Sequence, residues 1–340
     1  MLSVHLASAV RADSMSVIKC NIPLNVQYEI TYNCNNRCVF CYNKKQNLPY
    51  TEMNTQEAIR VIENVASCGV MSLNFNGGEP LTRDDFFDIV SVASDRGLDI
   101  HMNTNASLVD DLNAKMISKF FPAICTTVLD SNDINHDGLS GRNGALRDAI
   151  CGIRNLQKHD VYVAVNIMLS RRNIDNIKET YSFLHSLGIK SVLITRYVPC
   201  ENYELGLDIS DTQFLQAIDI IREYNYAHGC FDRIAFPQPY KLCNTTGALR
   251  TFIKDCNIPC NIGLCTASIS PNGDFTPCNL VKKPVLGNLL TESLEELWSG
   301  FEGEEYFCNQ HLEKECVTCS DLQNCGGGCK GYNDVVKKGR

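Results

Sequence analysis

Three cysteines stand within eight residues near the start of the chain, as Cys34, Cys38 and Cys41 in C-x3-C-x2-C spacing. Three thiolates can bind three irons of a cubic four-iron cluster and leave the fourth iron open. Because iron–sulfur clusters normally take four cysteines, this spacing predicts a site where a non-protein ligand completes the coordination. An open iron indicates chemistry rather than electron storage. A zinc knuckle is the alternative, although zinc motifs usually pair their cysteines as two C-x2-C units.

A second run that could do chemistry is Asn76-Gly77-Gly78-Glu79-Pro80, directly after a short strand-like segment. Glycines allow a close backbone approach that a Cβ would block. Glu79 adds a carboxylate at the same place. Taken alone, the run is equally consistent with a plain turn.

Cysteine usage is the outlier of the composition, with nineteen in the chain and nine between Cys256 and Cys329. Disulfide scaffolds are typical of short secreted chains, whereas this chain is long and shows no secretory signal at its start. The grouped cysteines therefore favour metal ligation in a reducing cytosol, and a cytoplasmic protein is expected.

The overall composition bounds the partners. The formal net charge of −8 argues against nucleic acid, because neutralising phosphates needs clustered Lys and Arg. No apolar run reaches the roughly 18–20 residues that span a bilayer. We therefore expect neither a nucleic-acid nor a membrane partner.

The elements that must position these residues alternate between strands and amphipathic helices, which predicts a parallel sheet with crossover helices. Six strand–helix units are fewer than the eight of a closed barrel, so a partial barrel is expected. The cysteine loop, the Gly-Gly-Glu-Pro run, Thr104-Asn105 and Asp130 all follow strand ends, where such folds carry their sites. The predicted strands are Val26–Thr31, Ser72–Phe75, Asp99–Asn103, Ile124–Leu129, Val161–Met168 and Ser191–Thr195, and the helices are Thr55–Ser67, Asp84–Arg96, Asp110–Phe120, Gly144–His159, Ile174–Leu187 and Asp211–His228.

From about Tyr240 the alternation stops and turn-rich, cysteine-rich sequence follows. Cluster ligands would replace part of a hydrophobic core in such a region. The expected organisation is an N-terminal tail over 1–22, a barrel over 23–239 and a metal-organised domain over 240–340.

The cysteine triplet followed by Gly77-Gly78-Glu79-Pro80 resembles the radical S-adenosylmethionine (SAM) superfamily, over residues of about 26 to 200. The resemblance implies an α/β fold with a partial (β/α)6 TIM-like barrel and a catalytic four-iron cluster on Cys34, Cys38 and Cys41. It further implies that S-adenosyl-L-methionine chelates the open iron, and that its reductive cleavage gives a 5′-deoxyadenosyl radical that abstracts hydrogen.

The same resemblance suggests which residues bind the cofactor. Gly77, Gly78 and Glu79 would receive the methionine amino group, and Phe40 matches a frequent aromatic near the adenine. Asn103-Thr104-Asn105 resembles the family's third-strand motif, with Ala106 in place of glycine. At the fourth strand the family's serine, glycine and arginine are replaced by Val128, Ser131 and Ser140, and Arg142 is a candidate for the displaced charge. The predicted further contacts from these strand ends are Thr104, Asn105, Asp130, Asn166 and Arg196.

The C-terminal cysteines resemble the SPASM domain, which carries auxiliary iron–sulfur clusters in that family. The spacings are Cys316-x2-Cys319-x5-Cys325-x3-Cys329 and Cys260-x12-Gly273-x4-Cys278. Carried over, the first of two auxiliary four-iron clusters uses Cys260, Cys265, Cys278 and Cys329, and the second uses Cys316, Cys319 and Cys325. A zinc ribbon is the alternative. The family's last cysteine has no counterpart in the eleven residues after Cys329, so Cys308, Cys256, a non-cysteine ligand or an open iron is expected in the fourth place.

These resemblances predict a radical SAM oxidoreductase or maturase that modifies a ribosomally made peptide. Only 33 residues precede Cys34, too few for an appended winged-helix domain that recognises a leader peptide. The alternative is the same chemistry on a small molecule such as an aminoglycoside, nucleoside or tetrapyrrole. A non-catalytic electron carrier is a third reading, which leaves the Gly-Gly-Glu-Pro run without a role. For the enzyme readings, an external electron donor of the flavodoxin or ferredoxin type is expected.

Overall fold

The structure is a computed structural model that describes residues 18–43, 51–199, 206–243, 245–281, 283–310 and 312–333. The strands are β1 (Asn25–Thr31), β2 (Ser72–Gly77), β3 (Asp99–Thr104), β4 (Ala123–Thr127), β5 (Tyr162–Leu169), β6 (Ser191–Arg196), β7 (Arg233–Ala235), β8 (Thr266–Ile269), β9 (Asp274–Thr276) and β10 (Gly287–Asn288). The helices are α1 (Thr55–Ser67), α2 (Phe86–Asp95), α3 (Asp111–Phe120), α4 (Asp133–Ser140), α5 (Ala145–Lys158), α6 (Ile177–Ser186), α7 (Asp211–His228), α8 (Gly247–Cys256), α9 (Leu294–Ser299), α10 (Gly303–Glu305) and α11 (Leu322–Cys325).

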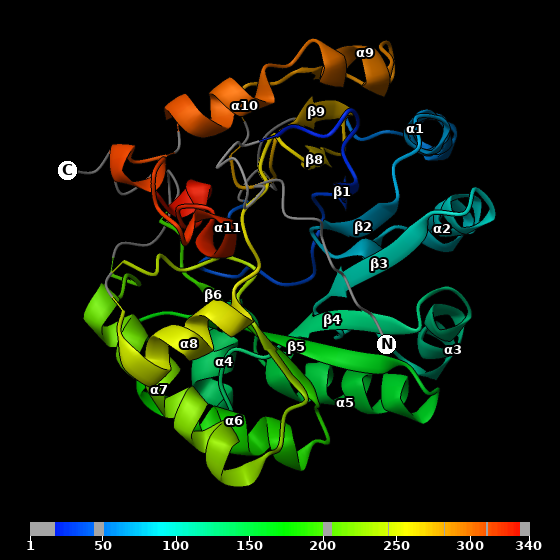
Figure 1. The fold of residues 1–340 in the computed structure, drawn as a ribbon. Coiled ribbons are helices and arrows are strands. Elements are labelled where there is room, and N and C mark those ends of the chain that lie inside the picture. The colour runs from blue at the N-terminus through cyan, green and yellow to red at the C-terminus, as the bar shows by residue number, and fades with distance from the viewer. Residues whose placement is uncertain are drawn as a thin grey trace.

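All ten described strands form one sheet in the order β10-β9-β8-β1-β2-β3-β4-β5-β6-β7. The pairs from β8 through β1 to β7 are parallel, and β9 and β10 are antiparallel additions. The sheet curves, and α1, α2, α3, α5, α6 and α7 cover its outer face (Figure 1). This arrangement confirms the predicted partial barrel with six strand–helix units.

Helix α1 shows why the pattern along the chain gives these elements. Its start is fixed by a capping box between Asn54 and Glu57, which satisfies exposed backbone N–H groups. Its buried residues recur at the spacing of one helix face and pack on the sheet. These residues are Ala58, Val61, Ile62 and Val65.

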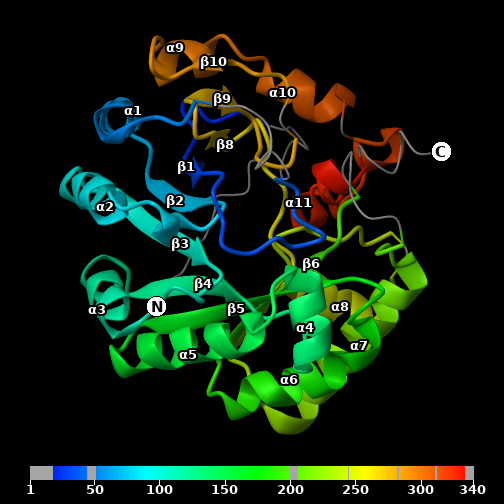
Figure 2. The same ribbon diagram turned by 180° about the vertical axis from the view of Figure 1, so that it is seen from behind.

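The cysteine-rich region continues the barrel's sheet. Strand β8 pairs in parallel with β1, with Asn25 opposite Thr266 and Tyr28 opposite Ile269. Helices α9 and α10 lie over β8 and β9, while α11 lies toward the opposite end of the sheet, near β6 and α8 (Figures 1 and 2). The region therefore bridges the two ends of the open sheet.

The described part of the predicted N-terminal tail is packed against this region. Cys20 N donates to Leu264 O at 2.8 Å, and the Lys19 ammonium donates to Phe301 O at 2.6 Å. Residues 18–22 therefore belong to the folded body in this structure. Residues 1–17 lie outside the described residues.

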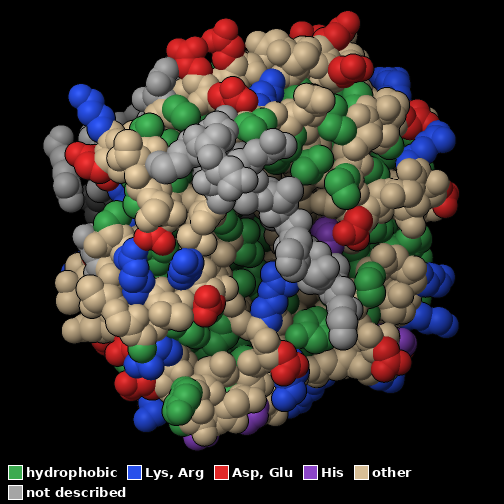
Figure 3. All heavy atoms as spheres, in the orientation of Figure 1, with side chains coloured by type: hydrophobic (Ala, Val, Ile, Leu, Met, Phe, Trp, Pro, Cys, Tyr) green, Lys and Arg blue, Asp and Glu red, His purple; other side chains and the backbone are tan. Residues whose placement is uncertain are grey.

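Charged side chains of both signs are mixed on the described surface in Figure 3, where Lys and Arg side chains are scattered among Asp and Glu side chains. None of the described helices is both long enough and apolar enough to cross a bilayer.

Candidate functional site

The cysteine loop after β1 is held by the end of helix α4. Arg37 N donates to Ser140 O at 3.0 Å, and Val39 N donates to Leu139 O at 2.9 Å. The C-cap Gly141 has φ +66°, and a Cβ there would lie 2.2 Å from Arg37 O. Only glycine can therefore end this helix so close to the loop. Helix α4 was not among the predicted elements, because its eight residues carry few apolar side chains.

Amide hydrogens point at the sulfur atoms of the loop. Asn36 N lies 3.4 Å from Cys34 Sγ, and Asn43 N lies 3.4 Å from Cys41 Sγ. Burial raises the pKa of the Cys34 thiol to about 11, and burial also raises that of Cys38. The free thiols thus stay protonated at neutral pH, and a bound metal would have to displace their protons. Hydrogen bonds to sulfur tune iron–sulfur clusters, so this loop fits such a group.

The Gly-Gly-Glu-Pro run packs directly on the start of the cysteine loop. Gly78 N donates to Thr31 O at 2.7 Å, and Glu79 N donates to Asn33 O at 2.8 Å. A Cβ on Gly77 would lie 2.3 Å from Thr31 O, and one on Gly78 would lie 2.0 Å from Asn33 O. The glycines are therefore required by backbone packing, whatever they contact in a bound cofactor.

The Glu79 carboxylate is completely buried and braces the end of β3. Its Oε1 accepts from Thr104 Oγ1 at 2.7 Å and from Leu81 N at 3.3 Å. Its Oε2 accepts from Asn105 N at 2.7 Å. Burial raises the pKa of Glu79 to about 7, although these donors oppose the shift. Glu79 thus positions the next strand end, and its predicted contact with the methionine amino group stays a prediction.

Asn105 connects this strand end to the cysteine loop. Its Nδ2 lies 3.8 Å from Cys34 Sγ and donates to Asn35 Oδ1 at 2.8 Å. Its Oδ1 accepts from Ser107 N at 2.9 Å, which fixes the amide orientation. The structure therefore brings Thr104, Asn105 and Glu79 to the cysteine loop, as expected for residues that follow the ends of parallel strands.

The predicted residues of the fourth and fifth strands, Asp130 and Asn166, differ in their hydrogen bonds to the rest of the protein. Asp130 is buried and accepts hydrogen bonds from Asn132 N at 2.8 Å and from the side chains of Asn135 and Asn176. It therefore shapes the β4–α4 loop. Asn166 donates to Thr195 Oγ1 at 3.2 Å, while its Oδ1 is buried and has no hydrogen-bond partner among the residues that the structure describes. That orphaned acceptor fits a site that receives a polar ligand.

Phe40 and Arg196 have protein partners in this structure. Phe40 packs against a small apolar cluster that includes Leu129 and Tyr197. The Arg196 guanidinium donates to Asp211 Oδ1 at 2.6 Å and lies 4.4 Å from the centre of the Tyr332 ring. Its charge is thus already paired, so Arg196 joins the barrel to the C-terminal region. The cofactor contacts predicted for both residues stay predictions.

Arg142 lies at the cysteine loop, as suggested for the displaced charge. Its Nε donates to Asn36 Oδ1 at 2.6 Å, and its Nη1 donates to Asp148 Oδ2 at 2.7 Å. The positive charge also lowers the pKa of Cys38, against the larger effect of burial. Arg142 can therefore balance negative charge on a cluster bound here.

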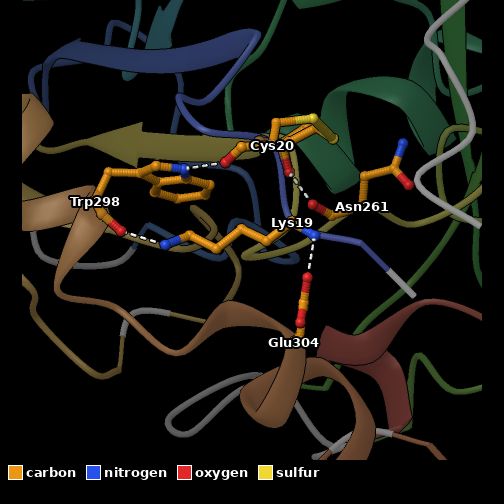
Figure 4. The surroundings of a disulfide bond; sticks show 7 residues. Lys19, Cys20, Asn261, Trp298 and Glu304 are labelled. Atoms are coloured by element: carbon orange, nitrogen blue, oxygen red, sulfur yellow. Dashed lines mark hydrogen bonds between the residues drawn. A yellow bond between two sulfur atoms is a disulfide. The ribbon is translucent and has the colours of Figure 1, made fainter. Parts of the chain in front are cut away.

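Three of the four predicted ligands of the first auxiliary cluster are neighbours. Burial, with a smaller contribution from the nearby Cys260 thiol, raises the pKa of Cys278 to about 11 and that of Cys329 to about 12. Cys265 differs, because its sulfur is bonded to Cys20 in a disulfide (Figure 4). The backbone explains this pairing, since Cys20 N and Leu24 N donate to Leu264 O and Cys265 O, both at 2.8 Å.

The Cys20–Cys265 bond corrects two expectations. Cys265 is not a free thiolate beside Cys260 in this structure, and the described cysteines include one disulfide where none was expected. Trp298 Nε1 donates to Cys20 O at 2.9 Å, and Lys19 N donates to Glu304 Oε1 at 2.7 Å, so the Cys20 side of the bond is anchored (Figure 4). The sequence held no spacing signal for Cys20, which lies 245 residues before its partner.

The second group of predicted ligands lines one small cavity. Cys316, Cys319 and Cys325 form its wall together with Cys243. Burial raises the pKa of Cys316, and the nearby thiols of Cys243 and Cys325 raise it further. The described residues hold no group of three His, Cys, Asp or Glu side chains around a single metal ion. The thiolates of a four-iron cluster each bind a different iron, so its cysteines need not converge on one point.

A fully buried lysine lies between the two cysteine groups. Lys330 has no exposed surface, and its Nζ donates to Gly326 O at 2.5 Å and lies 4.4 Å from the centre of the Phe307 ring. Burial lowers the pKa of Lys330, and the negative charge that Cys260, Cys316, Cys325 and Cys329 carry when deprotonated opposes this shift. A buried cation is stable only beside negative charge, which iron-bound thiolates would supply.

Comparison with known proteins agrees with both halves of this geometry. Residues 28–184 match the model of the radical SAM superfamily, and residues 260–325 match the iron–sulfur cluster-binding SPASM domain. The chain is a radical SAM enzyme with a SPASM domain. The predicted family is thereby confirmed, and the non-catalytic electron carrier is excluded.

Relatives of this radical SAM enzyme differ in their products. It is 27% identical to the AdoMet-dependent heme synthase of Methanosarcina barkeri over 327 residues, which cover 90% of this chain and 91% of the relative. It is 24% identical to the mycofactocin maturase MftC of Mycolicibacterium smegmatis over 312 residues, which cover 90% of this chain and 78% of that protein.

Solved structures share the radical SAM fold and its extension. Streptococcus suis SuiB bound to S-adenosylmethionine superimposes with a TM-score of 0.75 at 16% identity, covering 93% of this chain and 75% of SuiB. The enzyme anSMEcpe with bound AdoMet and a peptide gives 0.71 at 17% identity, covering 93% of this chain and 95% of that chain. These likenesses establish the fold. S-adenosylmethionine and iron–sulfur clusters are the cofactors that the two domains of the chain imply.

Proposed function

We propose that this radical SAM enzyme abstracts hydrogen from a ribosomally made peptide and thereby starts a crosslinking, epimerisation or oxidation. S-adenosylmethionine bound to a four-iron cluster on Cys34, Cys38 and Cys41 supplies a 5′-deoxyadenosyl radical on one-electron reduction. The observation that carries the proposal is the joint between the cysteine loop and the strand ends, where Asn105 lies 3.8 Å from Cys34 Sγ and is held by Glu79.

The protein's own residues hold the cysteine loop in a fixed position relative to the ends of the strands. Glu79 fixes the backbone of Asn105, and the Asn105 amide then orients the loop around Cys34. The orphaned Asn166 Oδ1 offers an acceptor to a polar group of the cofactor or substrate. Arg142 supplies positive charge on the side of Cys38. No residue is assigned as the hydrogen donor or acceptor of the substrate.

The choice of a peptide is supported by the architecture around the barrel. The structure of SuiB bound to its precursor peptide SuiA aligns with 94% of this chain, which includes the barrel and the cysteine-rich region. The anSMEcpe complex with a peptide aligns with 93%. A peptide site in this chain could therefore be formed between the barrel and the cysteine-rich region, which both aligned structures also contain.

A tetrapyrrole is the second candidate substrate. The heme synthase of Methanosarcina barkeri aligns over nine-tenths of both chains, at a higher identity than the peptide maturase MftC. The two candidate functions use the same radical-forming site. Only a measurement of which substrate loses hydrogen distinguishes them.

We further propose two auxiliary four-iron clusters in the cysteine-rich region and an external electron donor of the flavodoxin or ferredoxin type. Support comes from the two separate cysteine groups near Lys330. The buried ammonium group of this lysine would lie between the two anionic clusters. A reducing cytoplasm is the compartment that suits these clusters. About twelve irons per chain are expected after reconstitution, four for each of three clusters.

The test of function is an anaerobic assay of the reconstituted protein with S-adenosylmethionine and a reductant. We expect 5′-deoxyadenosine, with deuterium transferred from a labelled peptide substrate and not from an iron coproporphyrin. Transfer from the porphyrin alone would make the protein a tetrapyrrole enzyme. The absence of 5′-deoxyadenosine with every substrate would overturn the radical mechanism.

A further inference from the structure

A fourth cysteine, Cys243, shares the cavity of Cys316, Cys319 and Cys325. It lies in the segment between β7 and α8, more than seventy residues before the other three. Its side chain is exposed at the cavity edge, whereas Cys316 and Cys325 are buried. The cavity therefore has three cysteines from one loop and one from a different part of the chain.

The segment that carries Cys243 is held against the C-terminal segment of Cys316, Cys319 and Cys325 by charged side chains. Arg250 donates through Nη1 to the carbonyl oxygens of Leu242 and Thr245, and through Nη2 to Asp321 Oδ2. Lys241 Nζ lies 2.6 Å from Glu313 Oε1. Arg250 thus binds the backbone on both sides of Cys243 and also the side chain of Asp321, which precedes α11.

The backbone adds a further tie between the same two segments. Cys329 N donates to Pro239 O at 3.0 Å. A Cβ on Gly328, which has φ +84°, would lie 2.9 Å from Lys241 Cγ. Both segments therefore approach so closely that Gly328 leaves no room for a side chain.

The other cysteines proposed for the fourth place lie elsewhere. Cys256 is buried in the main core of the barrel, close enough to Tyr181 to raise the pKa of that hydroxyl. Cys308 packs at the edge of the apolar cluster that contains Ile262, Phe307 and also Cys316, outside the lining of the cavity. Neither lines the cavity of the three cysteines.

We propose that Cys243 is the fourth ligand of the second auxiliary cluster. This rests on the proposed presence of that cluster. Iron–sulfur clusters bound by four cysteines have no open iron, so this cluster would carry electrons and tie the two segments together, and it would not bind substrate.

The test removes the catalytic cluster first, so that the auxiliary clusters are seen alone. In the full chain carrying Cys34→Ala, Cys38→Ala and Cys41→Ala, we expect about eight irons after anaerobic reconstitution. Adding Cys243→Ala should remove about four of these irons on gel filtration with a chelator, and Cys243→Ser should shift the electron paramagnetic resonance signal of one cluster. Circular dichroism should show that both variants stay folded.

Matched controls are Cys308→Ala and Cys256→Ala in the same background, for which we expect unchanged iron content and spectra. Iron content and signals that are unchanged in both Cys243 variants would overturn the ligand assignment, as would iron loss in the Cys308 variant instead. A background protein that holds zinc, or about four irons or fewer, would show that the second cluster itself is absent and would refute the proposal at that earlier step.

Discussion

Asn279 Nδ2 donates a hydrogen bond to the Tyr42 hydroxyl at 3.1 Å, across 237 residues of sequence. Tyr42 directly follows Cys41, and Asn279 directly follows Cys278. The loop of the catalytic cluster and the loop of the first auxiliary site are therefore joined through one side-chain contact. Both residues could have been noticed from sequence only by their positions next to cluster ligands.

Breaking this joint should weaken the fold without removing iron. Tyr42→Phe removes the acceptor of the Asn279 amide and also the hydrogen bond between the Tyr42 hydroxyl and Glu29, and we expect a loss of at least about 1 kcal/mol in the free energy of unfolding. Anaerobic chemical denaturation of Tyr42→Phe, Asn279→Ala and the double variant should give a coupling energy of similar size. Additive effects of the two substitutions would show that the contact contributes nothing to stability.

Removing one ligand of the catalytic loop should abolish radical formation. We expect Cys34→Ala to make no 5′-deoxyadenosine and to lose about four of about twelve irons, because a cluster held by two cysteines is unstable. The matched control is Cys151→Ala, since Cys151 is an exposed cysteine in helix α5. Liquid chromatography and iron analysis measure both results, and wild-type turnover by Cys34→Ala would contradict the assignment.

Glu79 should make stability depend on pH. Burial raises its pKa from an ordinary 4.5 to about 7, so the folded protein holds a proton that the unfolded chain has lost between these values. The free energy of unfolding should therefore fall as pH rises from about 4.5 to about 7, by up to about 3 kcal/mol, and then level off. Denaturation curves across this range should be flatter for Glu79→Gln, and identical slopes would contradict the prediction.

Gly78 should not tolerate a methyl group. In Gly78→Ala the new Cβ would meet Asn33 O at 2.0 Å, so the backbone must move and we expect a loss of about 1–3 kcal/mol. Reconstituted iron on the catalytic loop should also fall. Gly138→Ala in helix α4 is the control, because a Cβ there meets nothing within 4 Å and alanine favours a helix. Equal melting temperatures of the two variants would contradict this account.

The sequence predicted what is local and periodic. The helical spacing of Val61, Ile62 and Val65 placed α1, and the cysteine triplet and the Gly-Gly-Glu-Pro run were predicted to meet at one rim, as they do. Side-chain direction was beyond this reasoning. Asp130 and Arg196 stand at strand ends as expected, yet Asp130 caps its own loop and Arg196 pairs with Asp211.

Contacts between distant segments carried no signal in the sequence. Cys243 belongs to no spacing motif and reaches the other cysteines through Arg250 and Asp321. Cys20 reaches Cys265 because two segments run side by side next to β1. Such juxtapositions depend on how the whole chain is packed, and a pattern of residue types within one window cannot contain them.

The pairing of β8 with β1 has a consequence for any attempt to shorten this protein. A truncation near residue 240 would strip β8 from β1, from Asn25 to Tyr28, and leave backbone N–H and C=O groups of a central, apolar strand without partners. Exposed strand edges of this kind recruit other chains into aggregates. The two regions of the chain are therefore not independent modules, and we expect a barrel without its C-terminal extension to aggregate.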